Sequence, residues 1–135
     1  MMWWQRLRPP SVAVASTTRA RGQWGEEQAL AYLQAQGLQL LERNYRTPGR
    51  GGGEIDLIMQ AADGTVVFVE VRSRSHRGFG GAGSSIGRSK QQRWVYAARH
   101  WLQHTGRESA CRFDAVLIDV ADLQWLQGVI EVDGS

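Results

Sequence analysis

The chain has 135 residues, of which 42% are hydrophobic and 21% are charged, and it contains one cysteine. This length suits a single domain with a core, and one cysteine excludes an internal disulfide framework and a cysteine-rich zinc site. No apolar run approaches the roughly 18 residues that a membrane helix needs. The formal charge of +3 comes from fifteen arginines and one lysine, Lys90, against 13 acidic residues.

These charges are segregated along the chain. Residues 1–21 carry arginines and no acid, residues 22–71 have an excess of acids, residues 72–112 are strongly basic, and residues 113–135 carry acids alone. An acidic block beside a basic block is what a metal-dependent site on a nucleic acid requires, although an ordinary domain of mixed charge can show the same pattern. Residue spacing must decide between the two interpretations.

Residues 1–21 are expected to form a flexible basic tail, which precedes a single domain over residues 22–135. The tail contains Pro9-Pro10 and small polar residues, and it lacks an amphipathic period. Its apolar pieces are too short for a secretion signal, so we expect a cytoplasmic location. A solvated leader is the simpler interpretation of its arginines, and phosphate contact is the other.

The pattern of apolar and turn residues predicts two helices and five strands. A first helix is expected over Gln23–Gln36, ending at Gly37, and a second over Ser89–Thr105, after a long glycine- and serine-rich loop. Alternating or β-branched runs between turn residues predict the strands, at Leu38–Arg46, Glu54–Gln60, Thr65–Arg72, Arg112–Val120 and Val129–Val132. The order α-β-β-β-α-β-β indicates one mixed α/β domain, with a central sheet flanked by helices.

The second and third predicted strands form a hairpin, because Ala62-Asp63-Gly64 between them is a turn signal. Side chains two residues apart on a strand share a face. Asp56 therefore lies on one face of its strand, and Glu70 and Arg72 lie together on one face of the next. If the register of the hairpin aligns them, Asp56 and Glu70 converge.

Two converging carboxylates suit Mg²⁺ or Mn²⁺, since such ions prefer oxygen ligands and leave positions for water and phosphate. The ion can activate a water and stabilise charge on a phosphodiester. Arg72 has the charge to assist, but it is a poor proton acceptor. The simpler alternative is a cross-strand set of ion pairs among Asp56, Glu70 and Arg72.

A series of ordered motifs runs through residues 22–120: Gly25-Glu26, Asn44-Tyr45-Arg46, Gly53-Glu54-Ile55-Asp56-Leu57-Ile58, Phe68-Val69-Glu70-Val71-Arg72-Ser73-Arg74, the helix starting at Lys90, and Arg112-Phe113-Asp114. This series resembles the YraN-like family of uncharacterised bacterial proteins. That family is in turn similar to the restriction-endonuclease-like (PD-(D/E)xK) superfamily, and closest in pattern to archaeal Holliday-junction resolvases. The resemblance implies a restriction-endonuclease-like core.

The superfamily site combines an Asp on one strand, an acid-x-Lys on the next, and often a Glu from the first helix. The resemblance therefore implies a catalytic and metal-binding set of Glu26, Asp56 and Glu70. Arg72 stands where the superfamily has lysine, which is a departure. Because the superfamily tolerates a lysine relocated to the following helix, Lys90 is the candidate replacement. A phosphate contact or a solvated helix start is the simpler interpretation of Lys90.

Basic residues on the strand end, the glycine loop and the second helix are predicted to bind nucleic acid: Arg74, Arg77, Arg88, Lys90 and Arg93. Glycines let a loop approach a phosphodiester closely, and phosphate contacts give sequence-independent, salt-sensitive binding. Gln92 and Tyr96 share a helical face and resemble a motif of RecB-type nucleases, a spacing that is common by chance. His100 and His104 also share a face, but no third metal ligand is evident.

Two functions stay open at this point. One is a Mg²⁺-dependent endonuclease for branched or structured DNA that acts as a homodimer, an expectation that rests on analogy with the resolvases. The other is a non-catalytic nucleic-acid-binding or adaptor protein on the same fold. Arg72 favours the second, whereas the three acids favour the first, because an inactive site has no need of them. Neither function calls for a membrane or a small-molecule cofactor.

Overall fold

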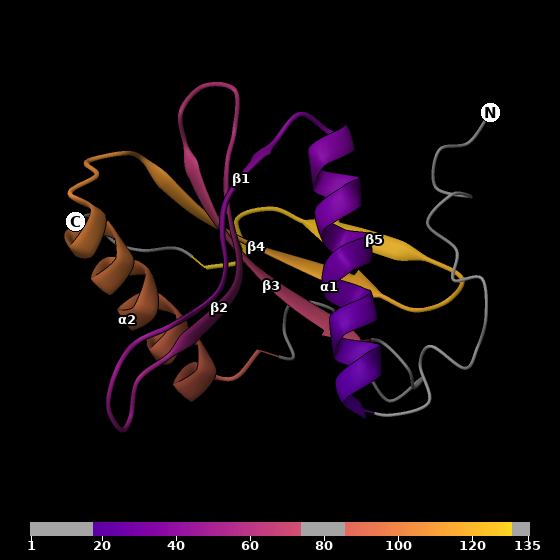
Figure 1. Cartoon of the computed structure of the whole chain (residues 1–135), viewed down its shortest axis with the longest axis horizontal. Helices are drawn as coiled ribbons and strands as arrows, with labels where there is room; N and C mark the ends of the chain where they lie inside the picture. Colours follow the sequence, from indigo (N-terminus) through magenta and orange to yellow (C-terminus); the bar gives the residue numbers. More distant parts are fainter. Residues whose placement is uncertain (1–17, 74–85, 131–135) are drawn as a thin grey trace.

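The computed structural model describes residues 18–73 and 86–130, and these contain two helices and five strands. Their bounds are α1 (Thr18–Ala35), β1 (Gln39–Arg46), β2 (Glu54–Gln60), β3 (Val66–Ser73), α2 (Arg88–Thr105), β4 (Cys111–Ile118) and β5 (Leu123–Leu126). Figure 1 shows this order along the chain. The predicted mixed α/β fold and the element order α-β-β-β-α-β-β are confirmed.

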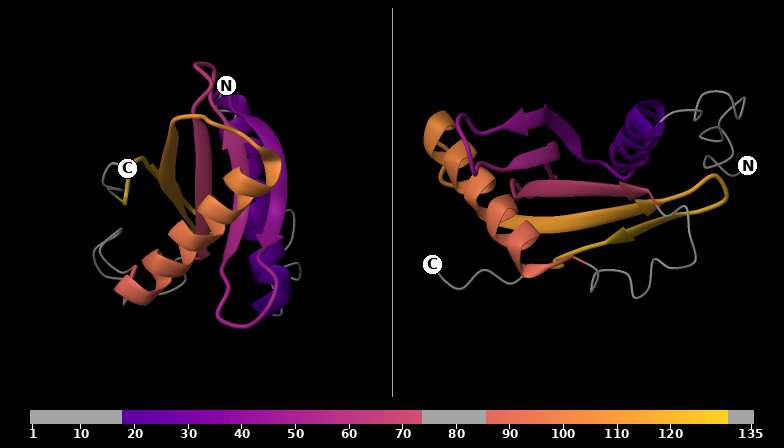
Figure 2. Two further views of the ribbon diagram at one scale, coloured as in Figure 1. Left: turned by 90° about the vertical axis from the view of Figure 1, so that its left-hand side faces the viewer. Right: turned by 90° about the horizontal axis from the view of Figure 1, so that it is seen from below.

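The strands form one sheet in the order β1-β2-β3-β4-β5. Neighbouring strands are antiparallel, except that β3 and β4 are parallel. A parallel pair requires a crossover connection, and α2 lies in that connection. The left view of Figure 2 shows α2 in front of the strands and α1 behind them, so each helix covers one face of the sheet.

Each face has its own apolar cluster. On the α2 side, Trp94, Ala97 and Trp101 pack against residues that include Phe68 and Phe113. A second cluster, on the α1 side, contains the buried residues Ala29, Leu33, Leu38, Leu57, Met59, Val67, Val69 and Val116. The central strand β3 contributes to both, which explains its nearly continuous apolar sequence. None of the described helices is long and apolar enough to cross a membrane.

α1 begins at Thr18, earlier than the predicted start at Gln23, so its first turn lies in the segment predicted to be tail. Gly22 occupies an exposed position inside the helix. A glycine there costs only about 1 kcal/mol relative to alanine, and the packed turns that follow can offset it. Residues 1–17 of the predicted tail lie outside the described residues.

The last strand is also displaced, because it occupies Leu123–Leu126 and the predicted Val129–Val132 is not a strand in its described part. After β4 the chain turns at Asp119, whose carboxylate accepts the N–H groups of Ala121 and Asp122 at 2.8 Å each. Such side-chain closure makes a tight turn and starts the next strand early. The other predicted boundaries lie within two residues of the observed ones.

Candidate functional site

The β2–β3 hairpin brings Asp56 and Glu70 to the same place. Its backbone pairs run from Gln60 with Val66 to Leu57 with Val69, and the same register sets Asp56 opposite Glu70 one step further. The main-chain pairing itself ends at Leu57 and Val69, just before these two acids. The Asp56 carboxylate instead accepts the N–H of Val71 at 2.8 Å, which fixes its orientation at the point where the strands part.

Glu70 lies on the α2 side of the sheet, because it continues the alternation that places Phe68 in that cluster. On β2 the alternation is broken around Asp56, since Ile55 and Ile58 belong to the cluster on the α2 side and Leu57 belongs to the other. Glu70 is only 7% exposed. Burial raises the pKa of Asp56 to about 7, and the negative charge of Glu70 adds to the rise. Burial also raises the pKa of Glu70, against the lowering effect of Lys90. The positive charge near Asp56 and Glu70 therefore does not fully offset the cost of burying the two carboxylates.

Lys90, the one lysine of the chain, is the cation that meets this pair. Its Nζ lies 3.1 Å from Oε2 of Glu70. The packing of α2 across the sheet brings the ammonium to β3, although the two residues are separated by the long glycine-rich loop. The predicted relocated lysine thus lies beside the second acid of the hairpin.

Arg72 stands two residues after Glu70 on the same side of β3, and its charge also lowers the pKa of Glu70. Its Nη1 is buried and has no hydrogen-bond acceptor within the described residues. Glu70 therefore has two cations nearby, of which only Lys90 forms a direct ion pair in this part of the chain.

Glu26 approaches from α1, the helix on the other side of the sheet. Its pKa is raised to about 7, first by burial and then by the negative charge of Asp56. Oε1 of Glu26 lies 4.0 Å from Nη2 of Arg43 on β1, and the side chain of Asn44 hydrogen-bonds to the same carboxylate. The three predicted acids thus influence one another electrostatically, with Glu26 held mainly by β1.

Asp56 and Glu70 are the residues suited to hold a divalent ion. Two buried oxygen donors, of which Glu70 raises the pKa of Asp56 by its negative charge, fit such a cation, because its charge would relieve their repulsion. Within residues 18–73 and 86–130, however, no three or more acidic, histidine or cysteine side chains are grouped to bind a metal. Glu26 is therefore not a direct third ligand in this arrangement.

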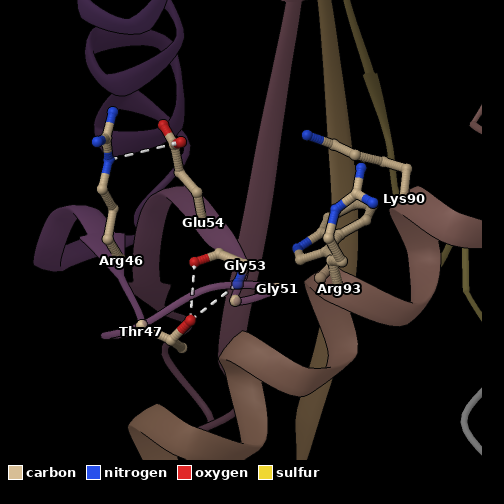
Figure 3. Close-up of a pocket in the computed structure, with 10 residues that line it drawn as sticks. Arg46, Thr47, Gly51, Gly53, Glu54, Lys90 and Arg93 are labelled. Carbon is tan, nitrogen blue, oxygen red and sulfur yellow. Dashed lines mark hydrogen bonds and ion pairs between the residues drawn. The ribbon is translucent and has the colours of Figure 1, made fainter.

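A cleft of about 480 Å³ has Lys90, the ion-pair partner of Glu70, in its lining. Figure 3 shows this cleft. One wall is the β1–β2 loop with its flanks, from Arg46 to Glu54, and the other is the start of α2, with Lys90, Arg93 and Trp94. We call this space the loop cleft. In Figure 3, Lys90 and Arg93 come from α2, across the space from the loop.

Sequence reasoning did not assign the β1–β2 loop to the site. The available signal was the glycine run after Pro48, which no regular element tolerates. That signal marks a loop, but it does not say what the loop faces. The packing of Gly53 against α2, which makes the loop a wall of the cleft, joins residues far apart in the chain.

The predicted nucleic-acid contacts divide into two groups. Arg88, Lys90 and Arg93 lie on the first turns of α2, where Arg88 and Arg93 are exposed and Lys90 is half-buried. Arg74 and Arg77 lie outside the described residues. The basic surface that the structure describes is therefore the start of α2 together with the loop cleft.

The other singled-out residues on α2 lie away from the acid pair. Gln92 and Tyr96 line a separate groove of about 350 Å³ with Arg88 and Arg99. His100 hydrogen-bonds through Nδ1 to the hydroxyl of Tyr45, and its ring stacks with that of His104. His100 thus joins α2 to β1, whereas the exposed His104 contacts His100 within the same helix, and neither is grouped with further metal ligands in the described part of the chain.

Comparison with known proteins gives the family. The sequence model of the uncharacterised protein family UPF0102 matches residues 25–118. A UPF0102 protein of Acidovorax sp. (strain JS42) is 62% identical over 119 residues, which cover 88% of this chain and 90% of the relative. One from Paracidovorax citrulli (strain AAC00-1) is 58% identical, covering 91% of each chain. The matched region includes Glu26, Asp56, Glu70 and Lys90, and the chain belongs to the uncharacterised protein family UPF0102.

Proposed function

We propose that the protein binds DNA and hydrolyses phosphodiester bonds in branched or structured DNA, with a divalent ion at Asp56 and Glu70. The observation that carries the proposal is the buried, mutually repelling pair of carboxylates with the Lys90 ammonium 3.1 Å from one of them. Carboxylates that are buried without full compensation cluster at functional sites. The basic cleft that Lys90 lines suits an anionic polymer.

Each residue has a distinct part in this proposal. Asp56 accepts the N–H of Val71 with one carboxylate oxygen, which leaves the other oxygen available to the ion. Bound Mg²⁺ or Mn²⁺ would supply charge neutralisation and an acidified water. The Lys90 ammonium can hold the attacking water, donate a proton to the leaving oxygen, or stabilise charge on the phosphate. Arg72 adds a permanent positive charge but does not accept a proton.

A second candidate function is a DNA-binding protein without turnover. The ammonium of Lys90 already neutralises part of the charge on Glu70, and Arg72 replaces the lysine of the resembling superfamily. A fixed ion pair would let the fold bind DNA without a metal. The two functions predict different effects of removing the acids, which makes them separable.

A homodimer and a cytoplasmic location are further parts of the proposal. The dimer follows from the analogy with resolvases, in which two cuts require two sites. The location accords with the use of a single cysteine, which fits a reducing compartment.

The deciding experiment uses labelled four-way junction, flap and linear duplex DNA in Mg²⁺ or Mn²⁺. Wild type is compared with Asp56→Ala, Glu70→Ala and the control Glu108→Ala, which removes an exposed acid beyond α2. We expect metal-dependent cleavage that falls at least about 100-fold in the first two variants and persists in the control. Salt-sensitive binding without cleavage, unaffected by any of the variants, would support the second function. Absence of binding at low salt would exclude both.

A further set of variants separates the two cations. Lys90→Gln should lower turnover about 100-fold, and Arg72→Gln about ten-fold, because only Lys90 can also transfer a proton. Lys90→Arg keeps the charge and removes the proton transfer. If Lys90→Arg matches wild type, Lys90 acts through its charge alone.

A further inference from the structure

We propose that the loop cleft binds an internal phosphate of the DNA strand, adjacent to the phosphate that lies at Asp56 and Glu70. This inference rests on the proposed function and adds to it a second contact on the strand. Its contacts come largely from the β1–β2 loop, which lies outside the set of basic residues predicted to touch nucleic acid.

The charges that line the loop cleft favour an anion. Arg46, Lys90 and Arg93 contribute positive charge, and Glu54 is the one acid among the lining residues. Nε of Arg46 lies 3.6 Å from Oε1 of Glu54, and the Arg46 side chain is 75% exposed. This ion pair is therefore weak, and Arg46 can exchange it for a contact with a phosphate. Arg93 is exposed and has no ion-pair partner within residues 18–73 and 86–130.

The loop side of the cleft is lined mainly by glycines: Gly49, Gly51, Gly52 and Gly53. A Cβ on Gly53 would lie 2.1 Å from the carbonyl oxygen of Arg93, and one on Gly52 would lie 2.0 Å from Oγ1 of Thr47. A side chain is therefore excluded at Gly52 and at Gly53. Thr47 closes the loop, because its N–H donates to the Gly53 carbonyl at 3.0 Å and its hydroxyl accepts the Gly53 N–H at 2.8 Å.

Backbone N–H groups of the same loop are available to a ligand. Gly49 and Gly51 have φ angles of +85° and +72°, on either side of Arg50, whose φ is not positive. Successive N–H groups in alternating conformations of this kind form concave anion sites. The N–H groups of residues 49–52 make no hydrogen bond to another described residue.

Trp94 gives an independent observation at the edge of the cleft. It is 1% exposed and lines the space, and its indole N–H has no acceptor within the described residues. A buried donor without an acceptor is unfavourable, and a phosphate oxygen in the cleft would supply one. The volume of about 480 Å³ is sufficient for a phosphate with its sugar. Because backbone contacts carry no sequence information, the cleft would position the strand without reading its bases.

The test is equilibrium binding of a fluorescein-labelled four-way junction without 5′-phosphates, in EDTA, at KCl concentrations from low to physiological. The variant Arg46→Gln/Arg93→Gln is compared with Arg99→Gln/Arg107→Gln, which removes the same charge from exposed positions further along α2 and just beyond it. We expect the first variant to bind about ten-fold more weakly and its salt slope to fall by about 1–2. The control should stay within about two-fold of wild type on both measures.

Trp94→Phe removes the indole N–H and keeps an aromatic ring. We expect it to weaken junction binding about three-fold, because the donor that a phosphate oxygen would use is removed. The urea midpoint should also fall, because the smaller ring leaves a cavity in the cluster on the α2 side. Trp101→Phe is the matched control, since its indole N–H donates to Glu42 at 2.8 Å. That control should lower the urea midpoint and leave junction binding unaltered.

The outcomes separate the inference from the proposed function. If wild type binds the junction and both double variants bind equally well, the inference is wrong and the proposed function stands. If wild type does not bind, the proposed function fails and the inference falls with it. If the effect of Arg46→Gln/Arg93→Gln appears only when the junction carries 5′-phosphates, the cleft holds a strand end, and an internal phosphate is excluded.

Discussion

Two buried acidic sites in this protein differ in how fully their charge is compensated. Asp114 on β4 is 0% exposed, yet it accepts hydrogen bonds from Nε and Nη2 of Arg112 at 2.9 Å each, from the indole of Trp125 at 2.9 Å and from the N–H of Gly128 at 3.0 Å. Asp56 accepts one backbone N–H, and Glu70 has the ion pair with Lys90.

This difference shows that burial of an acid does not by itself mark a functional residue. Asp114 lies in one of the motifs that resemble the YraN-like family, but its contacts join β4 to β5 and to the segment after it. A fully hydrogen-bonded charge of this kind stabilises structure. Asp56 and Glu70 accept few hydrogen bonds, and their pKa values are raised. Their ionised forms are therefore unfavourable in the folded protein, and a bound cation would stabilise them.

The largest expected effect breaks the compensated site. Asp114→Ala leaves the half-buried guanidinium of Arg112, the Trp125 indole and the Gly128 N–H without their acceptor. We expect the free energy of unfolding in urea to fall by about 2–4 kcal/mol. Asp63→Ala, in the exposed β2–β3 turn, is the control and should lose less than about 1 kcal/mol. An equal loss in the two variants would contradict the structural role of Asp114.

The next prediction concerns Gly53, in the β1–β2 loop that forms one wall of the loop cleft. Gly53→Ala forces a methyl group against the Arg93 carbonyl, so we expect a loss of about 1–3 kcal/mol of folding free energy. Gly87→Ala is the control, because Gly87 has φ of −70° and open space around its Cα. It should change the free energy of unfolding by less than about 0.5 kcal/mol. Thermal unfolding of both variants measures the difference.

Local patterns sufficed to predict the hairpin and its acids. The β-branched run of β3 and the turn at Ala62-Asp63-Gly64 make one register natural, and that register sets Asp56 opposite Glu70. The apolar residues Trp94, Ala97, Ala98 and Trp101 likewise recur at helical spacing, and they form the buried face of α2. These features depend on residues that are close together in the sequence, so they can be predicted from it.

Features that depend on distant packing were not predicted. The contact of Gly53 with the Arg93 backbone joins a loop to a helix far along the chain, so the loop cleft could not be foreseen. β5 has only four residues, and its position follows from the Asp119 turn, whose side-chain hydrogen bonds leave no periodic signal. The role of Asp114 was hidden for the same reason, because its partners lie on β5 and beyond.

A third prediction uses pH to sharpen the contrast between the sites. The pKa of Asp56 is about 7 in the folded protein and near 4 in an unfolded chain. Between these values the folded state keeps a proton that the unfolded state has released, so folding stability falls as pH rises from about 4 to about 7. Glu26, with its pKa also raised to about 7, acts in the same direction.

Asp56→Asn imitates the protonated acid and can still accept the Val71 N–H. We expect this variant to be more stable than wild type by about 1–3 kcal/mol at pH 8, and the difference to vanish near pH 4. Urea unfolding at a series of pH values measures both curves. A variant that is less stable than wild type at pH 8 would show that Asp56 is compensated as fully as Asp114.

The smallest effect tests the cation directly. At pH 8, above the pKa of Asp56, an ion that binds only the folded state stabilises it according to its concentration and affinity. With 10 mM Mg²⁺ and a dissociation constant of about 1 mM, the gain is about 1.4 kcal/mol, enough to raise the unfolding temperature of a small domain by several degrees. Asp56→Asn should lose this gain, whereas Glu108→Ala should keep it. Equal stabilisation of wild type and Asp56→Asn would mean that the ion acts on surface charge elsewhere, and that repulsion within the pair is relieved by Lys90 alone.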